Sequence, residues 1–231
     1  MGRKTKRGNM NFSETLKNHI KSNHLLNHPF YQAWMEGKIS KETLKEYASQ
    51  YYHHVSAFPR YISATHSNCA DASKRQILLE NLNEEEGTNN TSHPQLWLNF
   101  AEGMGANENT VKASEKKQAI HNVIETFLKH GKKSYAEGLA ALYAYEYQVP
   151  EVAGSKIEGL ENHYSINDEK TLKFFKVHQE ADVYHREACE KLIDQFSPAE
   201  QKLALKSAKE ASQALWDFLS SLPIEENKNA A

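Results

Sequence analysis

The segment from 175 to 192 carries polar side chains where helical periodicity places buried ones. Six residues follow one another at steps of three and four and therefore share one helix face: Phe175, His178, Asp182, His185, Cys189 and Leu192. The face begins and ends apolar, which predicts that it is turned inward. A buried aspartate needs a partner, and imidazole with carboxylate is a natural ligand set for iron, manganese or zinc. A hydrogen-bonded His–Asp–His cluster without metal explains this helix equally well.

A second segment repeats the anomaly with a glutamate. Glu146 stands seven residues after Leu139 and four after Leu142, so the three side chains share a face that is otherwise apolar. A single buried glutamate of this kind can instead belong to a structural ion pair rather than bind a metal. Tyr143 and Tyr145 flank Glu146, where they either pack or serve as electron relays.

The third segment is an acidic run followed by a histidine. Glu85 shares a helix face with Leu78 and Leu82, but Glu86 lies close to the same stripe, so periodicity does not choose between the two glutamates. A solvated helix end is the ordinary reading of such a run. His93 precedes a proline, where it either caps a helix or projects from its first turn.

Together these segments supply three carboxylates and three imidazoles, a donor set that suits two transition-metal ions. The six candidate ligands are Glu85, His93, Glu146, His178, Asp182 and His185. The absence of thiolate ligands argues against structural zinc and iron–sulfur sites. Open positions on such ions would admit dioxygen, so the pattern predicts an oxidase. The spacing differs from the Glu-x-x-His pairs of ferritin-like bundles.

The elements that position these residues are predicted to be helices throughout. Only 10 Gly and 6 Pro interrupt the 231 residues, and the 3.6-residue period recurs almost everywhere. We expect one all-α domain over 12–222, a basic disordered tail over 1–11 and a frayed end over 223–231. The predicted helix signals are an N-cap at Ser40, a bend or break at Pro59, a stop at Gly87, an N-cap at Ser114, a disturbance at Pro150 and a capping box at Ser197–Glu200.

Composition excludes several classes of function. The net charge of −2 gives no electrostatic case for nucleic-acid binding. No apolar run approaches the roughly 20 residues that span a membrane, and no signal-peptide core is visible. Two cysteines, Cys69 and Cys189, are too few for a disulfide scaffold, so a reducing cytoplasm is the expected location. A homodimer is the expectation from base rates alone.

The chain also resembles the haem-oxygenase-like dimetal oxidases, a superfamily related in fold to pyrroloquinoline-quinone synthase C. Within it, the chain resembles the family of the chlamydia protein associating with death domains. The resemblance runs from about Phe12 to Leu222 and is carried in order by His28-Pro29-Phe30-Tyr31, Ala57-Phe58-Pro59-Arg60-Tyr61, Asn81-Leu82 with the acids after it, Ala141-Leu142-Tyr143-Ala144-Tyr145-Glu146, and Glu180-Ala181-Asp182-Val183.

This resemblance implies a haem-oxygenase-like bundle of about seven helices around two metal ions, as an Fe/Fe or Mn/Fe pair. It selects Glu85 over Glu86 and supports the other five candidate ligands position by position. The loop between Glu85 and His93 is one residue longer here than in the relative, which keeps Glu86 open as the ligand.

The activity that the resemblance implies is oxygen-dependent synthesis of para-aminobenzoate for folate, in a single turnover. The protein's own tyrosine is the ring donor and a lysine is implicated in nitrogen donation; the matching positions are Tyr31 and Lys156. Oxidation of a phenol beside a dimetal centre makes its Cα–Cβ bond breakable, and glycine remains in the chain. Dioxygen is the co-substrate, an external reductant is required, and Tyr145 is a candidate relay. Phe174 stands where the relative has a tyrosine, so no redox role is possible there.

Both implied residues have ordinary readings, and two other functions compete. Tyr31 suits core packing, and a lone lysine such as Lys156 is ordinarily a surface charge. A metal-free thiamine-salvage-type hydrolase would use Cys189 as its nucleophile, although a buried cysteine is usually just a small apolar residue. A non-enzymatic death-domain-binding protein would fit the relative's name, but nothing in the sequence displays such a surface. The sequence leaves open the two metals, the nitrogen donor and the reductant.

Overall fold

The computed structural model describes residues 11–224, apart from the side chains of 180–184. The disordered tail predicted for 1–11 and the frayed end predicted for 223–231 therefore lie almost wholly outside the described residues. The side chain of Asp182 lies outside them as well.

The elements of the described chain are helices, which confirms the all-α prediction. In chain order they are α1 (Phe12–Lys21), the 3-10 helix η1 (Leu25–Asn27), α2 (Pro29–Met35), α3 (Lys41–Ser67), α4 (Ala72–Glu86), α5 (His93–Gly103), α6 (Glu108–Ala113), α7 (Gln118–Lys133), α8 (Tyr135–Glu146), α9 (Val149–Tyr164), α10 (Glu169–Ile193) and α11 (Pro198–Ser220). The prediction of about seven helices is wrong, because the described residues form eleven α-helices. The short helices α2 and α6 and the division between α8 and α9 raise the number.

Three predicted helix ends are confirmed by their hydrogen bonds. The Ser40 hydroxyl accepts the backbone N–H of Thr43 at the start of α3. Ser197 and Glu200 form the reciprocal capping box at the start of α11, with proline in the first turn. Gly87 ends α4 with a φ of 76°, a left-handed conformation that glycine adopts without the steric cost of a Cβ atom.

Of the bend or break predicted at Pro59, the break is wrong: helix α3 runs from Lys41 through to Ser67, because a proline removes a single helical hydrogen bond and buried neighbours on both sides, Phe58 and Tyr61, hold the helix in the core. Two other predictions are wrong in place. The α8–α9 break precedes Pro150, which lies in the first turn of α9, where its missing N–H costs little. Ser114 ends α6, and α7 begins only after Lys117.

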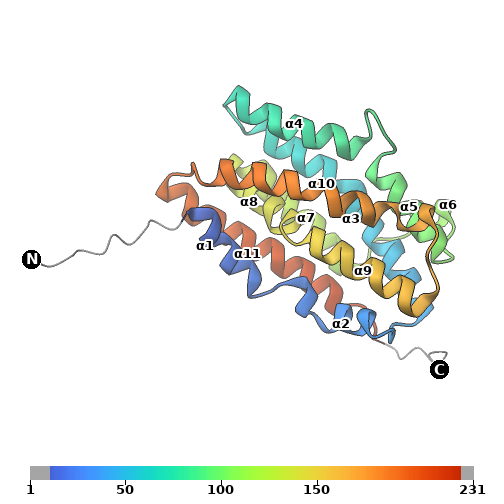
Figure 1. The fold of residues 1–231 in the computed structure, drawn as a ribbon. Coiled ribbons are helices and arrows are strands. Elements are labelled where there is room, and N and C mark those ends of the chain that lie inside the picture. Colours follow the sequence, from blue (N-terminus) through green and yellow to red (C-terminus); the bar gives the residue numbers. More distant parts are fainter. Residues whose placement is uncertain (1–10, 225–231) are drawn as a thin grey trace, which may run out of the picture.

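Helix α8 forms the centre of the bundle. Every residue from Ala136 to Glu146 is buried, as expected for a helix with neighbours on all sides. It packs against α11, α7, α10 and α3, and α10 in turn packs against α9, α5 and α4. Figure 1 shows α4 along one side of the bundle, with α10 between it and the helices of the opposite side. The helices that carry the predicted ligands, α4, α5, α8 and α10, therefore meet in one part of the fold.

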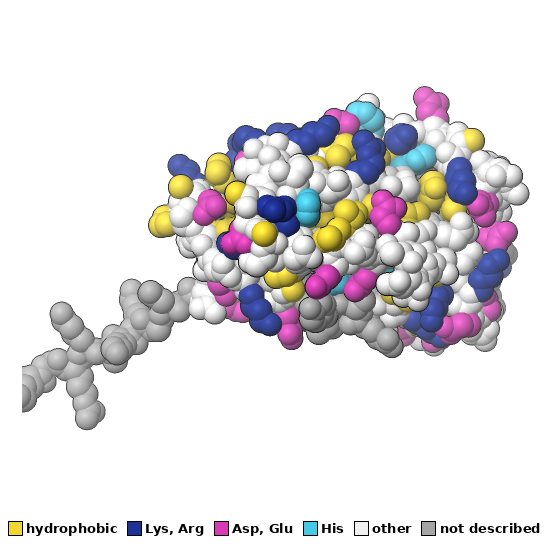
Figure 2. Space-filling view, turned by 90° about the horizontal axis from the view of Figure 1, so that it is seen from above, with side chains coloured by type: hydrophobic (Ala, Val, Ile, Leu, Met, Phe, Trp, Pro, Cys, Tyr) yellow, Lys and Arg dark blue, Asp and Glu magenta, His cyan; other side chains and the backbone are white. Residues whose placement is uncertain are grey.

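The outer surface carries charges of both signs. Figure 2 shows Lys and Arg side chains interspersed with Asp and Glu over one face of the bundle. Within the described residues, none of the helices combines the length and apolarity that a membrane crossing requires.

Candidate metal centre

Three predicted ligands from three helices converge in the interior. Glu85 of α4, His93 of α5 and His178 of α10 each offer a donor atom, and these atoms lie within 4.8 Å of one another. The Nδ1 of His93 lies 3.0 Å from Oε1 of Glu85. All three residues are buried, and among the described residues no other group of donors this close was found. A shared position among them can take one cation.

The ring of His178 is oriented by its own helix. Its Nδ1 lies 2.7 Å from the backbone oxygen of Phe174, and a carbonyl oxygen only accepts, so Nδ1 carries the proton. Burial, together with the nearby His93 ring, lowers the pKa of His178 well below its usual value, so the ring is neutral. Nε2 therefore carries the free lone pair. Such a backbone hydrogen bond on the far nitrogen is typical of histidines that bind metal.

Glu146 lies at the end of α8, held from two sides. Its Oε1 accepts a hydrogen bond of 2.6 Å from Nδ2 of Asn81, and its Oε2 lies 3.5 Å from Sγ of Cys189, whose thiol donates. Asn81 stands one helical turn before Glu85 on α4, so Glu146 faces the same stretch of α4 as the three-residue group. The cysteine proposed as the nucleophile of the alternative hydrolase is thus a hydrogen-bond donor to this carboxylate.

His185 stands seven residues after His178 on α10 and contacts the same stretch of α4. Its Nε2 lies 3.1 Å from Oε2 of Glu84, and the His185 side chain is 6% exposed. Glu85 is the buried member of the acidic run, and Glu86 is exposed. The burial of Glu85 thus favours it over Glu86 as the ligand. Five of the six predicted ligands lie at one stretch of α4: Glu85 belongs to it, His93 and His178 lie near Glu85, Glu146 contacts Asn81, and His185 contacts Glu84. The sixth, Asp182, falls outside the described side chains.

The predicted tyrosine and lysine form a second polar group inside the bundle. Tyr31 is 2% exposed, and its hydroxyl oxygen lies 3.1 Å from that of Tyr47. Nζ of Lys156 donates to the same Tyr47 oxygen at 2.6 Å. Tyr47 thus joins the amine and the Tyr31 phenol in one hydrogen-bonded chain.

Lys156 is not the surface charge that a lone lysine ordinarily is. It is 5% exposed, and Nζ lies between 5.1 and 5.6 Å from the centroids of five aromatic rings, those of Tyr31, Tyr47, Tyr51, Trp97 and Phe175. The rings attract the cation, but they cannot replace the lost hydration. Burial therefore lowers the pKa of Lys156 to about 7, which leaves a large share of the amine neutral near neutral pH.

One aromatic wall separates this group from the metal ligands. Tyr31, Tyr145, Lys156 and Phe174 all line a cavity of about 10 Å³, room for a single water molecule. The Phe174 ring packs against the His178 ring, with ring centroids 4.0 Å apart and the ring planes tilted by 31°. The metal donors and the tyrosine–lysine chain are therefore neighbours across Phe174. Tyr145, the predicted relay, lies on the cavity wall, whereas Tyr143 donates to Glu190 instead.

The buried donor set fits a transition-metal ion. Buried carboxylate and neutral imidazole are the ligands that iron and manganese take in proteins, and the described donors include no thiolate. The Glu85–His93–His178 group would hold one ion, and Glu146 and His185 would contribute to the other. Such a centre beside buried phenols is suited to oxidising an aromatic side chain in a site that excludes bulk water.

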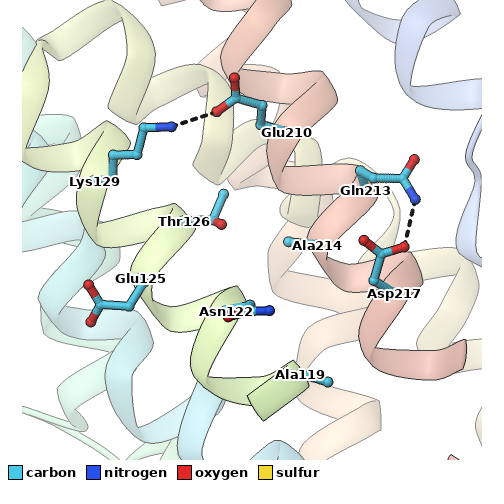
Figure 3. Close-up of a pocket in the computed structure, with 9 residues that line it drawn as sticks. All are labelled: Ala119, Asn122, Glu125, Thr126, Lys129, Glu210, Gln213, Ala214 and Asp217. Carbon is cyan, nitrogen blue, oxygen red and sulfur yellow. Dashed lines mark hydrogen bonds and ion pairs between the residues drawn. The ribbon is translucent and has the colours of Figure 1, made fainter. Parts of the chain in front are cut away.

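A much larger hollow lies elsewhere, on the surface of the bundle. A groove of about 670 Å³ runs over the surface between α7 and α11 and is drawn in Figure 3. Four of its polar side chains form pairs, Lys129 with Glu210 and Gln213 with Asp217. It contains no histidine or cysteine, so it offers none of the chemistry seen in the interior.

Four residues of the site are not among the candidate site residues named from the sequence. Tyr47 and Tyr51 stand four residues apart on α3, a spacing that equally describes core packing, and only the fold shows that Tyr47 touches both Tyr31 and Lys156. From the sequence, Glu84 is expected to be an ordinary solvated carboxylate, and only the packing of α10 against α4 shows its contact with His185. Asn81 carried a usable signal, since it precedes Glu85 by one turn on an otherwise apolar face.

Comparison with known proteins gives consistent matches along the chain. Residues 45–216 match the family described as "Iron-containing redox enzyme". The chain is 38% identical over 213 residues to 4-aminobenzoate synthase from Chlamydia muridarum, covering 92% of this chain and 90% of the relative. It is 40% identical over 222 residues to 4-aminobenzoate synthase from Nitrosomonas europaea, covering 90% and 89%. A solved TenA homologue from Pseudomonas syringae pv. tomato shares the fold, with a TM-score of 0.79, 17% identity and coverage of 90% and 91%.

Proposed function

The chain belongs to the 4-aminobenzoate synthases among the iron-containing redox enzymes, and from this premise we propose that it makes para-aminobenzoate for folate synthesis from its own Tyr31. The proposal includes a dimetal centre, Fe/Fe or Mn/Fe, held by Glu85, His93, Glu146, His178, Asp182 and His185. The observation that carries it is the hydrogen-bonded chain from Lys156 through Tyr47 to Tyr31, one ring away from the metal donors.

When bound, the two ions supply the activation of dioxygen, which is the oxidant of the reaction. The chain's own residues then determine which side chain is oxidised. Burial raises the pKa of Tyr31 well above its usual value, so the phenol keeps its proton in the resting protein. Losing an electron makes a phenol strongly acidic, and the Tyr47 oxygen at 3.1 Å is positioned to receive that proton.

Lys156 completes the path at its far end. Because its pKa is about 7, much of the amine is neutral and has a lone pair at Nζ, 2.6 Å from the Tyr47 oxygen. A neutral amine can accept a proton or form a bond to carbon, whereas an ammonium ion can do neither. The position of Lys156 supports its role as nitrogen donor. Cleavage of the Tyr31 Cα–Cβ bond would leave glycine at position 31, so each chain would react once.

The test is mass spectrometry of the protein itself. Metal-free protein is loaded with Fe²⁺ and Mn²⁺, reduced and exposed to oxygen, and the peptide containing Tyr31 is then analysed together with free para-aminobenzoate. We expect the Tyr31 side chain to be lost in proportion to the product. An intact Tyr31 alongside product would move the ring source elsewhere.

Two matched variants separate the reacting tyrosine from its neighbours. Tyr31→Phe should abolish product, because phenylalanine has no hydroxyl to lose a proton. Tyr61→Phe removes a buried hydroxyl from α3 that contacts His54 and should leave product formation intact. Equal loss in both variants would point to a general effect on the core.

A further inference from the structure

Two hollows lie on the surface beside the α4–α5 connection. One has a volume of about 230 Å³ and the other of about 520 Å³. They share Glu84, Asn89 and Asn90 in their linings, so they adjoin. The second hollow is also lined by His93, a member of the buried donor group. Solvent therefore reaches the edge of the candidate metal centre at this point.

Glu84 occupies the boundary between these hollows and the interior. Its side chain is 47% exposed, yet Oε2 lies 3.1 Å from Nε2 of His185, a side chain that is 6% exposed. The next residue, Glu85, is turned inward and contacts His93. Successive residues of a helix point about 100° apart. The two glutamates thus face the outer and inner parts of the same centre.

A divalent ion that enters a buried site must lose its hydration shell, which is costly unless ligands replace the water stepwise. A half-exposed carboxylate can bind a cation that still keeps most of its water. The same carboxylate already lies within contact distance of a predicted buried ligand, His185. The arrangement offers an outer first ligand and an adjacent inner second ligand.

We propose that Glu84 is the loading ligand of the metal centre, the carboxylate that takes a divalent cation from the surface hollows and transfers it to His185 and the buried donors. The inference rests on the proposed dimetal function and adds to it a residue outside the six predicted ligands. No bond other than metal–ligand bonds is made or broken.

The test follows uptake of Co²⁺ by metal-free protein, through the visible absorption of the bound ion, with rates from stopped-flow mixing and affinity from titration. We expect Glu84→Gln to slow uptake and weaken at least one equivalent by about 10- to 100-fold, the range found when residues next to metal ligands are replaced. The control is Glu80→Gln, which removes the same charge one turn earlier on α4 and also lines the smaller hollow. It should change the rate less than twofold, because no contact joins Glu80 to a predicted ligand in the described structure.

Two results would overturn the inference while leaving the proposed function in place. One is Glu84→Gln protein that takes up Co²⁺ as fast and as tightly as the unmodified protein. The other is equal slowing in both variants, which would reduce the effect to general attraction by surface charge. Unmodified protein that binds no Co²⁺ would overturn the dimetal centre itself.

Discussion

Replacing Lys156 with methionine should stabilise the protein at neutral pH. Folding lowers the pKa of this amine from 10.5 to about 7, so the folded state binds its proton more weakly than the unfolded state does. Below pH 7 both states carry the ammonium ion and the whole cost of burial is present; above about 10.5 both are neutral and the cost vanishes. Stability therefore rises with pH between these two values.

The size of the effect follows from the two pKa values. At pH 7 the buried amine costs about 4 kcal/mol of folding free energy, and about 2 kcal/mol of that is recovered by pH 9. Methionine keeps the length of the side chain without the charge, but it gives up the hydrogen bond to Tyr47, worth about 1 kcal/mol. Lys156→Met should therefore be about 3 kcal/mol more stable at pH 7, and its advantage should shrink by about 2 kcal/mol at pH 9.

The assay is urea unfolding at pH 7, 8 and 9, with the exposed Lys45→Met on α3 as the control. Groups that titrate in both proteins cancel in the difference between variant and unmodified protein. The control should change stability by less than about 0.5 kcal/mol and should not alter the pH slope. A Lys156→Met protein that is less stable at pH 7, or that keeps the original slope, would refute the account of a buried amine whose pKa is lowered to about 7.

Three further predictions concern neighbouring side chains. Tyr47→Phe removes the hydroxyl that joins Lys156 to Tyr31, so para-aminobenzoate formation should fall about 10- to 100-fold while circular dichroism is unchanged; full activity would remove Tyr47 from the path. Asn81→Leu removes the 2.6 Å hydrogen bond to Glu146 and should weaken metal binding about 10- to 100-fold, measured by titration calorimetry. Unchanged metal affinity would contradict a role of the Glu146 carboxylate as a ligand. Burial lowers the pKa of His54 from 6.5 to about 3. As the pH falls below 6.5, His54 therefore becomes protonated in the unfolded chain but not in the folded protein, and folding stability is lost. His54→Phe should abolish about 2 kcal/mol of the loss between pH 6.5 and 4.5 in urea unfolding, and an unaltered acid limb would contradict this.

The faces that carry the candidate ligands were predictable because helical periodicity is strict. Glu146 and His178 stand on apolar stripes, and the structure buries both. Periodicity did not separate Glu85 from Glu86, since neighbours in a helix lie only about 100° apart, and the packing of α4 against α5 and α10 was needed to show which is buried. Contacts between distant segments could not be predicted either, because they too depend on how the helices pack.

The tyrosine–lysine chain illustrates what sequence reasoning cannot reach. Tyr31, Tyr47 and Lys156 come from α2, α3 and α9, and no spacing along the chain relates them. The burial of Lys156, and with it the lowered pKa, depends on rings contributed by five separate positions of the fold. The expected number of helices came from the resemblance, and short helices such as α6 carry too few residues for a periodic signal to correct it.

The most direct measurement is anomalous X-ray diffraction from crystals loaded with Mn²⁺, recorded on both sides of the manganese absorption edge. We expect two manganese peaks inside the bundle, one between Glu85, His93 and His178 and the other beside Glu146 and His185. Crystals with no interior peak, and with these side chains hydrogen-bonded to one another or to water instead, would contradict the dimetal centre and the oxidation that depends on it.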